Sequence, residues 1–214
     1  MLFYNQSEIH SWERFYRANL INSLTGFKSV SLLGTVNQNG QTNLGVFSSI
    51  VHMGSDPALI GYINRPRKAA PHTLANIEST GVYTINHILP SFLEKAHQTS
   101  AKYPEDVSEF DEVGLTPQYF GNFPAPFVGE SLVRYGLTLQ EIVPIEINAT
   151  FLVIGKIHSI LLEDELIRPD GFIDLHKAET VCSNGIDSYY STKPLGRLNY
   201  AKPGQKLALK LPHE

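Results

Sequence analysis

The chain has 214 residues, enough for one large domain or two small ones with a sizeable core. Its formal net charge of −4 excludes a general nucleic-acid-binding or membrane-binding surface. Cys182 is the only cysteine, so no internal disulfide or thiolate metal cluster can form, and a cytoplasmic location is expected. The first residues carry early acids and no long apolar core, so we expect no signal peptide, and no apolar run is long enough to span a bilayer.

The amino-terminal segment predicts one helix and a hairpin. Ser7 is a candidate cap for a helix over about residues 7–25, because apolar residues recur there at helical spacing. Trp12 is expected on the buried face of that helix. Two strand-like runs then flank Asn39 and Gly40, a dipeptide typical of hairpin turns because both residues can take positive φ.

The next segment predicts a strand, a helix and a further strand. Residues 58–64 (ALIGYIN) form a short, mainly apolar run that predicts a strand. Residues 71–80 are predicted to be helical, because Pro71 suits a first turn and Gly81 suits the end of a helix. Residues 81–86 are predicted to form the following strand.

The second half of the chain predicts an inserted region and two long strands. Residues 88–128 form the inserted loop and helix region, with helices expected at 89–98 and near 107–113. From residue 132 onward two longer β-type runs follow, and residues 170–204 are loop-rich. Meandering strands with few helices favour an antiparallel barrel over alternating βαβ units.

Several common catalytic motifs are absent from the sequence. We find no G-x-G-x-x-G, no G-x-x-x-x-G-K-[ST], no G-x-S-x-G and no H-E-x-x-H. The histidines lack metal-ligand spacing, so we expect surface or hydrogen-bonded roles and no metal: His52, His72, His87 and His97. Ser48 and Ser49 lack a recognised base. Any chemistry must therefore come from a less obvious arrangement of side chains or from a cofactor.

A cluster of positive charge precedes the predicted helix at residues 71–80. Arg65, Arg67 and Lys68 lie close together in a chain that is acidic overall. Such a cluster either forms a solvated loop or holds an anion at the helix N-terminus. On composition alone the solvated loop is favoured.

The order of segments resembles the flavin reductase-like family, the FMN-binding split barrels. The resemblance rests on TVNQNGQTNLGVFSSI, SDPALIGYI, RPRK, HTLANIESTG, VYTIN, YPEDVSEFDEVGLTP and PLGRLNYAKP, and it runs from about Val30 to Pro203. It implies a mainly β fold, a six-stranded antiparallel Greek-key split β-barrel with helical additions. Residues 1–214 would form one FMN-binding domain, which in this family usually forms homodimers.

The resemblance also assigns cofactor-binding residues by position. In this family one strand runs along the flavin ring and ribityl chain. The residues of this sequence that match it by position are Asn43, Phe47, Ser48 and Ser49. By position, Arg67, Lys68 and Thr73 match the segment that holds the FMN phosphate in this family. The resemblance therefore interprets the basic cluster as a phosphate-binding site. Further matches are Asn86 at the end of a strand, and Thr99 and Ser100 with His97 in a loop that approaches the cofactor.

The resemblance implies an NAD(P)H-dependent flavin reductase, in which hydride passes from nicotinamide to flavin and the cofactor carries the chemistry. A flavin-dependent oxygenase is the expected partner. One alternative is an FMN-containing electron carrier, similar to flavoredoxin, without efficient NAD(P)H oxidation. Another is a split-barrel protein that has lost flavin or binds a different ligand.

Overall fold

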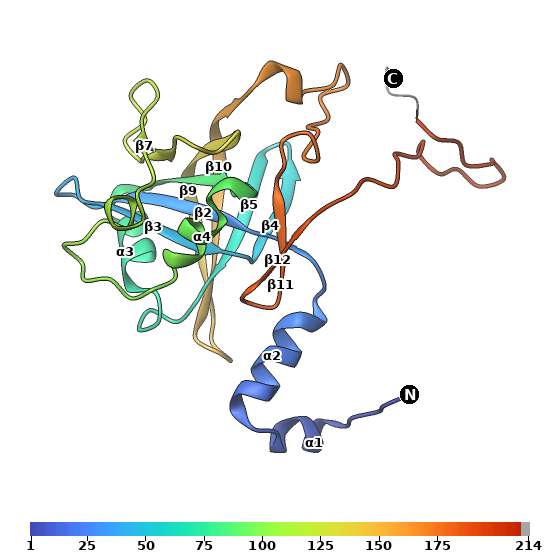
Figure 1. Cartoon of the computed structure of the whole chain (residues 1–214), viewed down its shortest axis with the longest axis horizontal. Helices are drawn as coiled ribbons and strands as arrows, with labels where there is room; N and C mark the ends of the chain where they lie inside the picture. The colour runs from blue at the N-terminus through green and yellow to red at the C-terminus, as the bar shows by residue number, and fades with distance from the viewer. Residues whose placement is uncertain (211–214) are drawn as a thin grey trace.

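The computed structural model describes residues 1–210, and a seven-stranded antiparallel sheet forms its body (Figure 1). The strands follow each other in the order β3-β2-β6-β9-β10-β5-β4. Their bounds are β2 (Ser31–Val36), β3 (Thr42–Phe47), β4 (Ile50–Ser55), β5 (Ala58–Asn64), β6 (Val82–His87), β9 (Val133–Ile145) and β10 (Thr150–Leu162).

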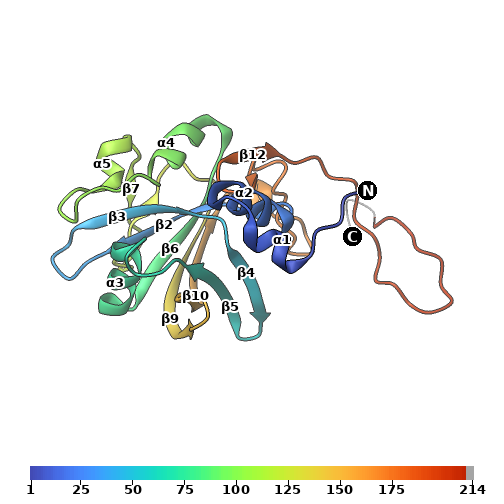
Figure 2. The same cartoon turned by 90° about the horizontal axis from the view of Figure 1, so that it is seen from below.

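The two edge strands of this sheet are halves of one run of chain. Only Ser48 and Ser49 separate β3 from β4, yet the two strands lie at opposite ends of the strand order. With β3 and β4 counted as one bent strand, six strands close into a barrel that is split where the halves diverge (Figure 2). The predicted six-stranded split barrel with helical additions is confirmed.

The hairpin between β2 and β3 forms where the sequence predicted it. The Asn37 carboxamide oxygen accepts hydrogen bonds from the backbone amides of Asn39 and Gln41 at 2.9 and 3.0 Å. Gly40 takes a φ of 84°, a backbone conformation that glycine adopts without steric cost. The turn therefore fixes the register of Val36 opposite Thr42.

Helix α3 (Pro71–Thr80) connects β5 to β6 and closes one end of the barrel. It has the predicted bounds: proline lies in the first turn, and Gly81 ends the helix in the left-handed conformation, with its amide bonded to the Ile77 carbonyl. Leu74 and Ile77 are fully buried in the barrel core. The same packing directs Thr73 and Asn76 toward β2 and β3.

The inserted region packs on the outside of β2 and β3. It holds η1 (Pro90–Phe92), α4 (Leu93–Gln98), α5 (Glu109–Val113), β7 (Pro117–Gln118) and β8 (Phe127–Val128). The helices expected at 89–98 and near 107–113 are confirmed. Apolar side chains of this region form a second core cluster with residues on the outer face of the barrel. The inserted region contributes Phe92, Ala96 and Phe110 to it, and β2 and β3 contribute Leu32 and Leu44.

A second, three-stranded sheet contains part of the segment expected to be loop. β1 (Lys28–Ser29), β11 (Val181–Asn184) and β12 (Ser188–Ser191) pair in the order β1-β11-β12. The expectation for residues 170–204 was therefore incomplete, since the segment contains this hairpin. A short η2 (Asp164–Leu166) precedes it.

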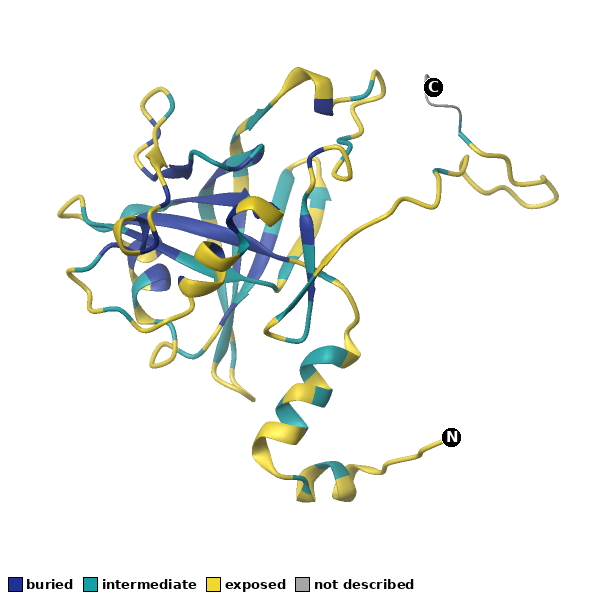
Figure 3. Ribbon diagram, in the orientation of Figure 1, coloured by how far each residue is buried: buried dark blue, intermediate teal, exposed yellow. Residues whose placement is uncertain are grey.

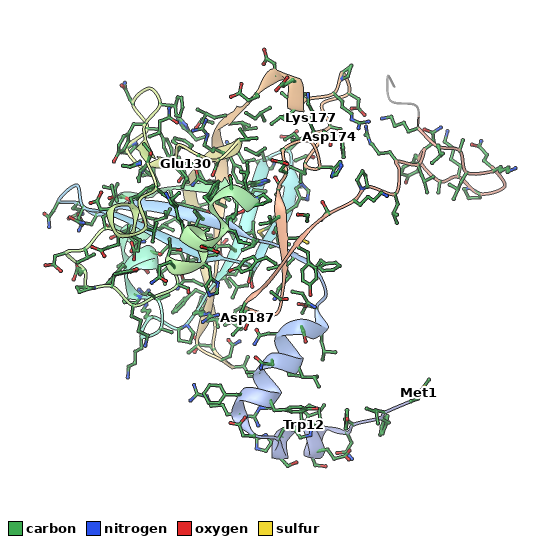
Figure 4. The ribbon with its side chains drawn as sticks, in the orientation of Figure 1. Met1, Trp12, Glu130, Asp174, Lys177 and Asp187 are labelled. Carbon is green, nitrogen blue, oxygen red and sulfur yellow. The ribbon has the colours of Figure 1, made fainter. Side chains whose placement is uncertain are left out.

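The prediction of one amino-terminal helix was wrong in its bounds and its burial. Two helices form, α1 (Gln6–Ser11) and α2 (Arg14–Leu24). Asn5, not Ser7, caps α1, and the Glu13 carboxylate caps α2. Neither helix buries a residue: both are exposed or intermediate along their length (Figure 3). Trp12 lies between the two helices, away from the barrel (Figure 4).

No helix among residues 1–210 is both long enough and apolar enough to cross a membrane.

Candidate functional site

A cavity of about 560 Å³ lies along β3. The chain from Asn43 to Ser49 lines it, as do parts of the loop and helix start between residues 63 and 73. Residues 99–103 with Glu109 line it too, and the three-stranded sheet contributes Lys28, Ser183 and Tyr189. A cavity of this size is in the range that small-molecule and cofactor ligands occupy.

Most of the predicted cofactor-binding residues meet in this cavity. Eight of them line it: Asn43, Phe47, Ser48, Ser49, Lys68, Thr73, Thr99 and Ser100. Arg65 of the basic cluster lines it as well. Arg67, Asn86 and His97 are not among the lining residues.

The backbone of β3 presents a free edge to the cavity. Within residues 1–210, β3 pairs only with β2, so every second amide and carbonyl points away from the sheet. The Leu44 amide points that way, because it donates to the Glu109 carboxylate at 2.8 Å. By the same alternation the Val46 amide and carbonyl point to the same side, and Val46 lines the cavity.

Glu109 is a buried carboxylate in the cavity wall that the sequence did not single out. Burial raises the pKa of Glu109, while the hydrogen bond from the Leu44 amide and the nearby His72 act in the opposite direction. Its contact with Leu44 fastens α5 to β3. Glu109 therefore holds the inserted region against the strand that forms the cavity floor.

The start of α3 and two cations form one corner of the cavity. Ala70 precedes the helix without a side-chain cap, so the first amides of α3 have no side-chain acceptor at that position. Arg65 and Lys68 line the same corner, and neither pairs with a carboxylate within residues 1–210. Thr73 is held toward β3 by a 3.1 Å hydrogen bond from the Asn43 carboxamide. This corner suits an anion.

The structure places Arg67 outside this corner. Its guanidinium donates two hydrogen bonds to the Glu78 carboxylate and stacks over the Phe151 ring, 4.9 Å from the ring centroid. These contacts raise the pKa of Arg67 and lower that of Glu78, mainly through the side-chain hydrogen bonds. Arg67 is thus engaged by a helix residue eleven positions later, a pairing that the sequence order alone did not indicate.

The structure also places Asn86 in the core. Its side chain is fully buried and makes three hydrogen bonds. The carboxamide nitrogen donates to the Leu32 carbonyl at 3.1 Å and to the Thr84 hydroxyl at 2.9 Å, and the oxygen accepts from the Val128 amide at 2.9 Å. Asn86 therefore joins β6 to β2 and β8, with no group left for a ligand.

The three-stranded sheet forms a wall of the cavity that the sequence analysis missed. His97, expected to approach a cofactor, instead bonds this wall: its Nδ1 lies 2.7 Å from the Tyr189 hydroxyl. Tyr200 is 90% exposed and lines no part of the cavity. The available signal was Asn184-Gly185, the same type of hairpin dipeptide that located the first turn.

No group of three or more His, Cys, Asp or Glu side chains within the described residues is arranged to hold a metal ion.

The chain matches a family model described as flavin reductase like domain over residues 26–177. A crystal structure from Shewanella frigidimarina, assigned as a flavin reductase with a split barrel domain, is 46% identical with a TM-score of 0.91. It covers 94% of this chain and 100% of that chain. Nitrilotriacetate monooxygenase component B from Bacillus cereus shares the fold, with 20% identity, a TM-score of 0.82, and 92% and 98% of the two chains covered. An uncharacterized protein of Aquifex aeolicus is 24% identical over 80% of each chain.

Proposed function

Because the chain belongs to the flavin reductase-like family, we propose that it binds FMN and transfers hydride from NADH or NADPH to flavin. The observation that carries this proposal is that the free edge of β3 and the start of α3 line the same cavity. No side chain caps the start of α3, and Arg65 and Lys68 beside it pair with no carboxylate within residues 1–210. A flavin ring has a polar edge and FMN ends in a phosphate, so the two features match the two ends of one ligand.

The phosphate end fits the corner formed by Arg65, Lys68 and the start of α3. The phosphate is a dianion, and two cations with the helix amides can balance and bond its oxygens. The Thr73 hydroxyl would add a further donor, and its position is fixed by Asn43. Each charge-assisted hydrogen bond contributes about 1.5–3 kcal/mol when it is sheltered from water.

The ring end fits the free edge of β3. Val46 offers an amide and a carbonyl to the donors and acceptors of the flavin ring. Gly45 leaves room beside this edge: a Cβ on that residue would lie 3.1 Å from the Phe47 ring and 3.5 Å from the Thr73 hydroxyl oxygen. Glycine at this position keeps the space between Phe47 and α3 open for a ligand.

When bound, FMN supplies the two-electron chemistry, and the residues of this chain bind and orient it. β3 fixes the polar edge of the ring, and the start of α3 fixes the phosphate. Glu109 keeps the inserted region over the cavity, which limits the access of water. No general base is required of the protein.

The experiment measures FMN affinity and reduction in the same preparation. Changing Lys68→Ala with Thr73→Ala is expected to weaken FMN binding by about 100- to 10,000-fold, because two sheltered phosphate contacts are lost. Arg67→Ala is the matched control, since its side chain faces Glu78 instead of the cavity, and its affinity should equal that of the wild type. Unchanged affinity in the double variant would remove the phosphate assignment.

Anaerobic mixing with NADH and with NADPH then tests the reaction. Bleaching of the flavin absorbance within seconds is expected for a reductase. If FMN binds tightly but stays oxidised over minutes with both nucleotides, the protein is an electron carrier and the reductase proposal fails.

We further propose that the amino-terminal helices pack against a second copy of the chain. Phe15, Tyr16 and Leu24 are 69%, 52% and 69% exposed, which is costly for an isolated helix in water. A homodimer would cover them. Light scattering should give a dimer mass, and deletion of residues 1–25 should give a monomer.

The proposed consumer of the reduced flavin is an oxygenase, and flavin-dependent oxygenation after mixing with such an enzyme would test this.

A further inference from the structure

Three side chains form a row across the three-stranded sheet. Lys28 on β1 pairs with Ser183 on β11, and Ser183 pairs with Tyr189 on β12. Directly opposed residues of an antiparallel sheet project from the same face. All three line the cavity, so this face is one of its walls.

Ser183 carries a polar group without a partner. The residue is only 2% exposed, and its hydroxyl makes no hydrogen bond within the described residues. An unpaired buried hydroxyl costs about 1–3 kcal/mol, so its presence in a cavity wall needs a reason. A ligand that accepts a hydrogen bond from Ser183 would supply one.

Lys28 places a fixed cation beside this hydroxyl. Its ammonium donates to the Asn22 carbonyl at 3.1 Å and to the Gly185 carbonyl at 3.0 Å. No carboxylate pairs with it among residues 1–210. Lys102, on the neighbouring wall, adds a second cation that pairs with no carboxylate in the part of the chain that the structure describes. Asp187 lies in the turn of the hairpin (Figure 4) and is not a lining residue. The wall is therefore positively charged.

Tyr189 fixes the wall in place. The hydrogen bond between its hydroxyl and His97 fastens β12 to α4, and the two rings meet edge to face at 5.7 Å. Burial raises the pKa of Tyr189, and so does the charge of Asp187, so the phenol is neutral at physiological pH. The wall is thus braced on the side of the inserted region.

This wall lies at the opposite end of the cavity floor from the phosphate corner. Asn43 contacts Thr73 at one end of β3, and the Ser29 hydroxyl of β1 contacts the Ile50 carbonyl just beyond its other end. Six residues lie between Asn43 and Ile50, and the chain bends at Ser48 and Ser49. Ser183 and Tyr189 also lie outside the matched family segment, residues 26–177. Lys28, the third member of the row, lies inside that segment.

We propose that the row Lys28–Ser183–Tyr189, with Lys102, binds the pyrophosphate group of the nicotinamide dinucleotide that reduces the flavin. The proposal rests on the proposed function. The Ser183 hydroxyl and the two ammonium groups meet the phosphate oxygens, and the nicotinamide extends along β3 toward the ring site. Bound FMN uses the cations at the start of α3, which leaves Lys28 and Lys102 for the second nucleotide.

The test measures binding of ADP-ribose, which carries the pyrophosphate but cannot reduce flavin, to FMN-loaded protein by calorimetry. Ser183→Ala is expected to raise its dissociation constant about tenfold, because one hydrogen bond to a charged oxygen is lost. Ser131→Ala is the matched control: Ser131 is also buried, its hydroxyl has no hydrogen-bond partner among the described residues, and it lies outside the cavity wall. Its ADP-ribose affinity should equal that of the wild type. Neither variant should lower the melting temperature, since each removes an unsatisfied polar group.

The outcomes separate this inference from the proposed function. Weaker ADP-ribose binding in Ser183→Ala and in Lys102→Met, with unchanged FMN affinity, supports the wall. Equal ADP-ribose affinity in Ser183→Ala, Ser131→Ala and the wild type overturns it, even where NADH still reduces the flavin. A parallel loss of FMN affinity in Ser183→Ala also overturns it, because the wall would then belong to the FMN site. Absence of reduction by both nucleotides defeats the reductase proposal, and with it this assignment.

Discussion

Replacing Asn86 by alanine separates a structural role from a cofactor-binding role. The sequence resemblance assigned Asn86 to FMN, whereas the structure commits all of its hydrogen-bonding contacts to the protein. Asn86→Ala should therefore destabilise the fold while the surviving folded protein keeps its affinity for FMN.

The magnitude follows from the three hydrogen bonds. Each contributes about 1 kcal/mol net, and the fully buried Val128 amide then lacks its acceptor, which adds about 1–2 kcal/mol. The expected loss in the free energy of unfolding is about 4–5 kcal/mol. Asn19→Ala, at an exposed position on α2, is the control and should change stability by less than about 0.5 kcal/mol.

Urea denaturation followed by tryptophan fluorescence and circular dichroism gives the free energy, and FMN titration below the transition gives the affinity. Circular dichroism is needed because Trp12 lies between the two amino-terminal helices, away from the barrel, and reports poorly on the barrel. A stability loss under 1 kcal/mol combined with a tenfold weaker FMN affinity would refute the structural role of Asn86.

Two further predictions concern charged and titrating side chains. Arg67→Met should leave FMN affinity unchanged, because its side chain faces Glu78 instead of the cavity. It should cost at most about 0.5 kcal/mol of stability, because the ion pair with Glu78 is solvent-exposed. A large loss of affinity in FMN titration would show that Arg67 belongs to the phosphate site after all. Burial lowers the pKa of His87 to about 4 from 6.5, so its stabilising effect is complete above pH 6.5 and is lost as the pH falls toward 4. Wild type should lose up to about 3 kcal/mol more than His87→Asn between pH 7 and pH 4 in chemical denaturation. Equal losses in the two proteins would contradict the buried, neutral histidine.

Local signals in the sequence located the elements whose ends are fixed by backbone chemistry. α3 begins and ends where Pro71 and Gly81 indicate, because proline and glycine restrict the backbone whatever lies around them. The Asn39-Gly40 turn was found for the same reason. The first helix was misjudged because the Glu13 side chain caps a second helix, and an acidic residue between two helical runs gives no clear break in apolar spacing.

Side-chain direction was the part of the site that the sequence did not determine. Arg65 and Arg67 are two residues apart and equally basic, yet only Arg65 reaches the cavity, because Glu78 draws Arg67 to the outer face of α3. Likewise the wall with Ser183 depends on a strand pairing between residues more than 150 positions apart. Such pairings follow from the closed fold, and local spacing does not reveal them.

The continuity of β3 and β4 gives ligand binding a mechanical consequence. Since the chain switches from one margin of the sheet to the other within Ser48 and Ser49, the seam of the barrel and the exposed backbone along the cavity are the same stretch of polypeptide. A flat ligand with donors and acceptors along one side can act there as a substitute for a missing neighbouring strand. A bound ligand should then hold the two sides of the seam together, so that the loaded protein has a higher melting temperature than the empty one.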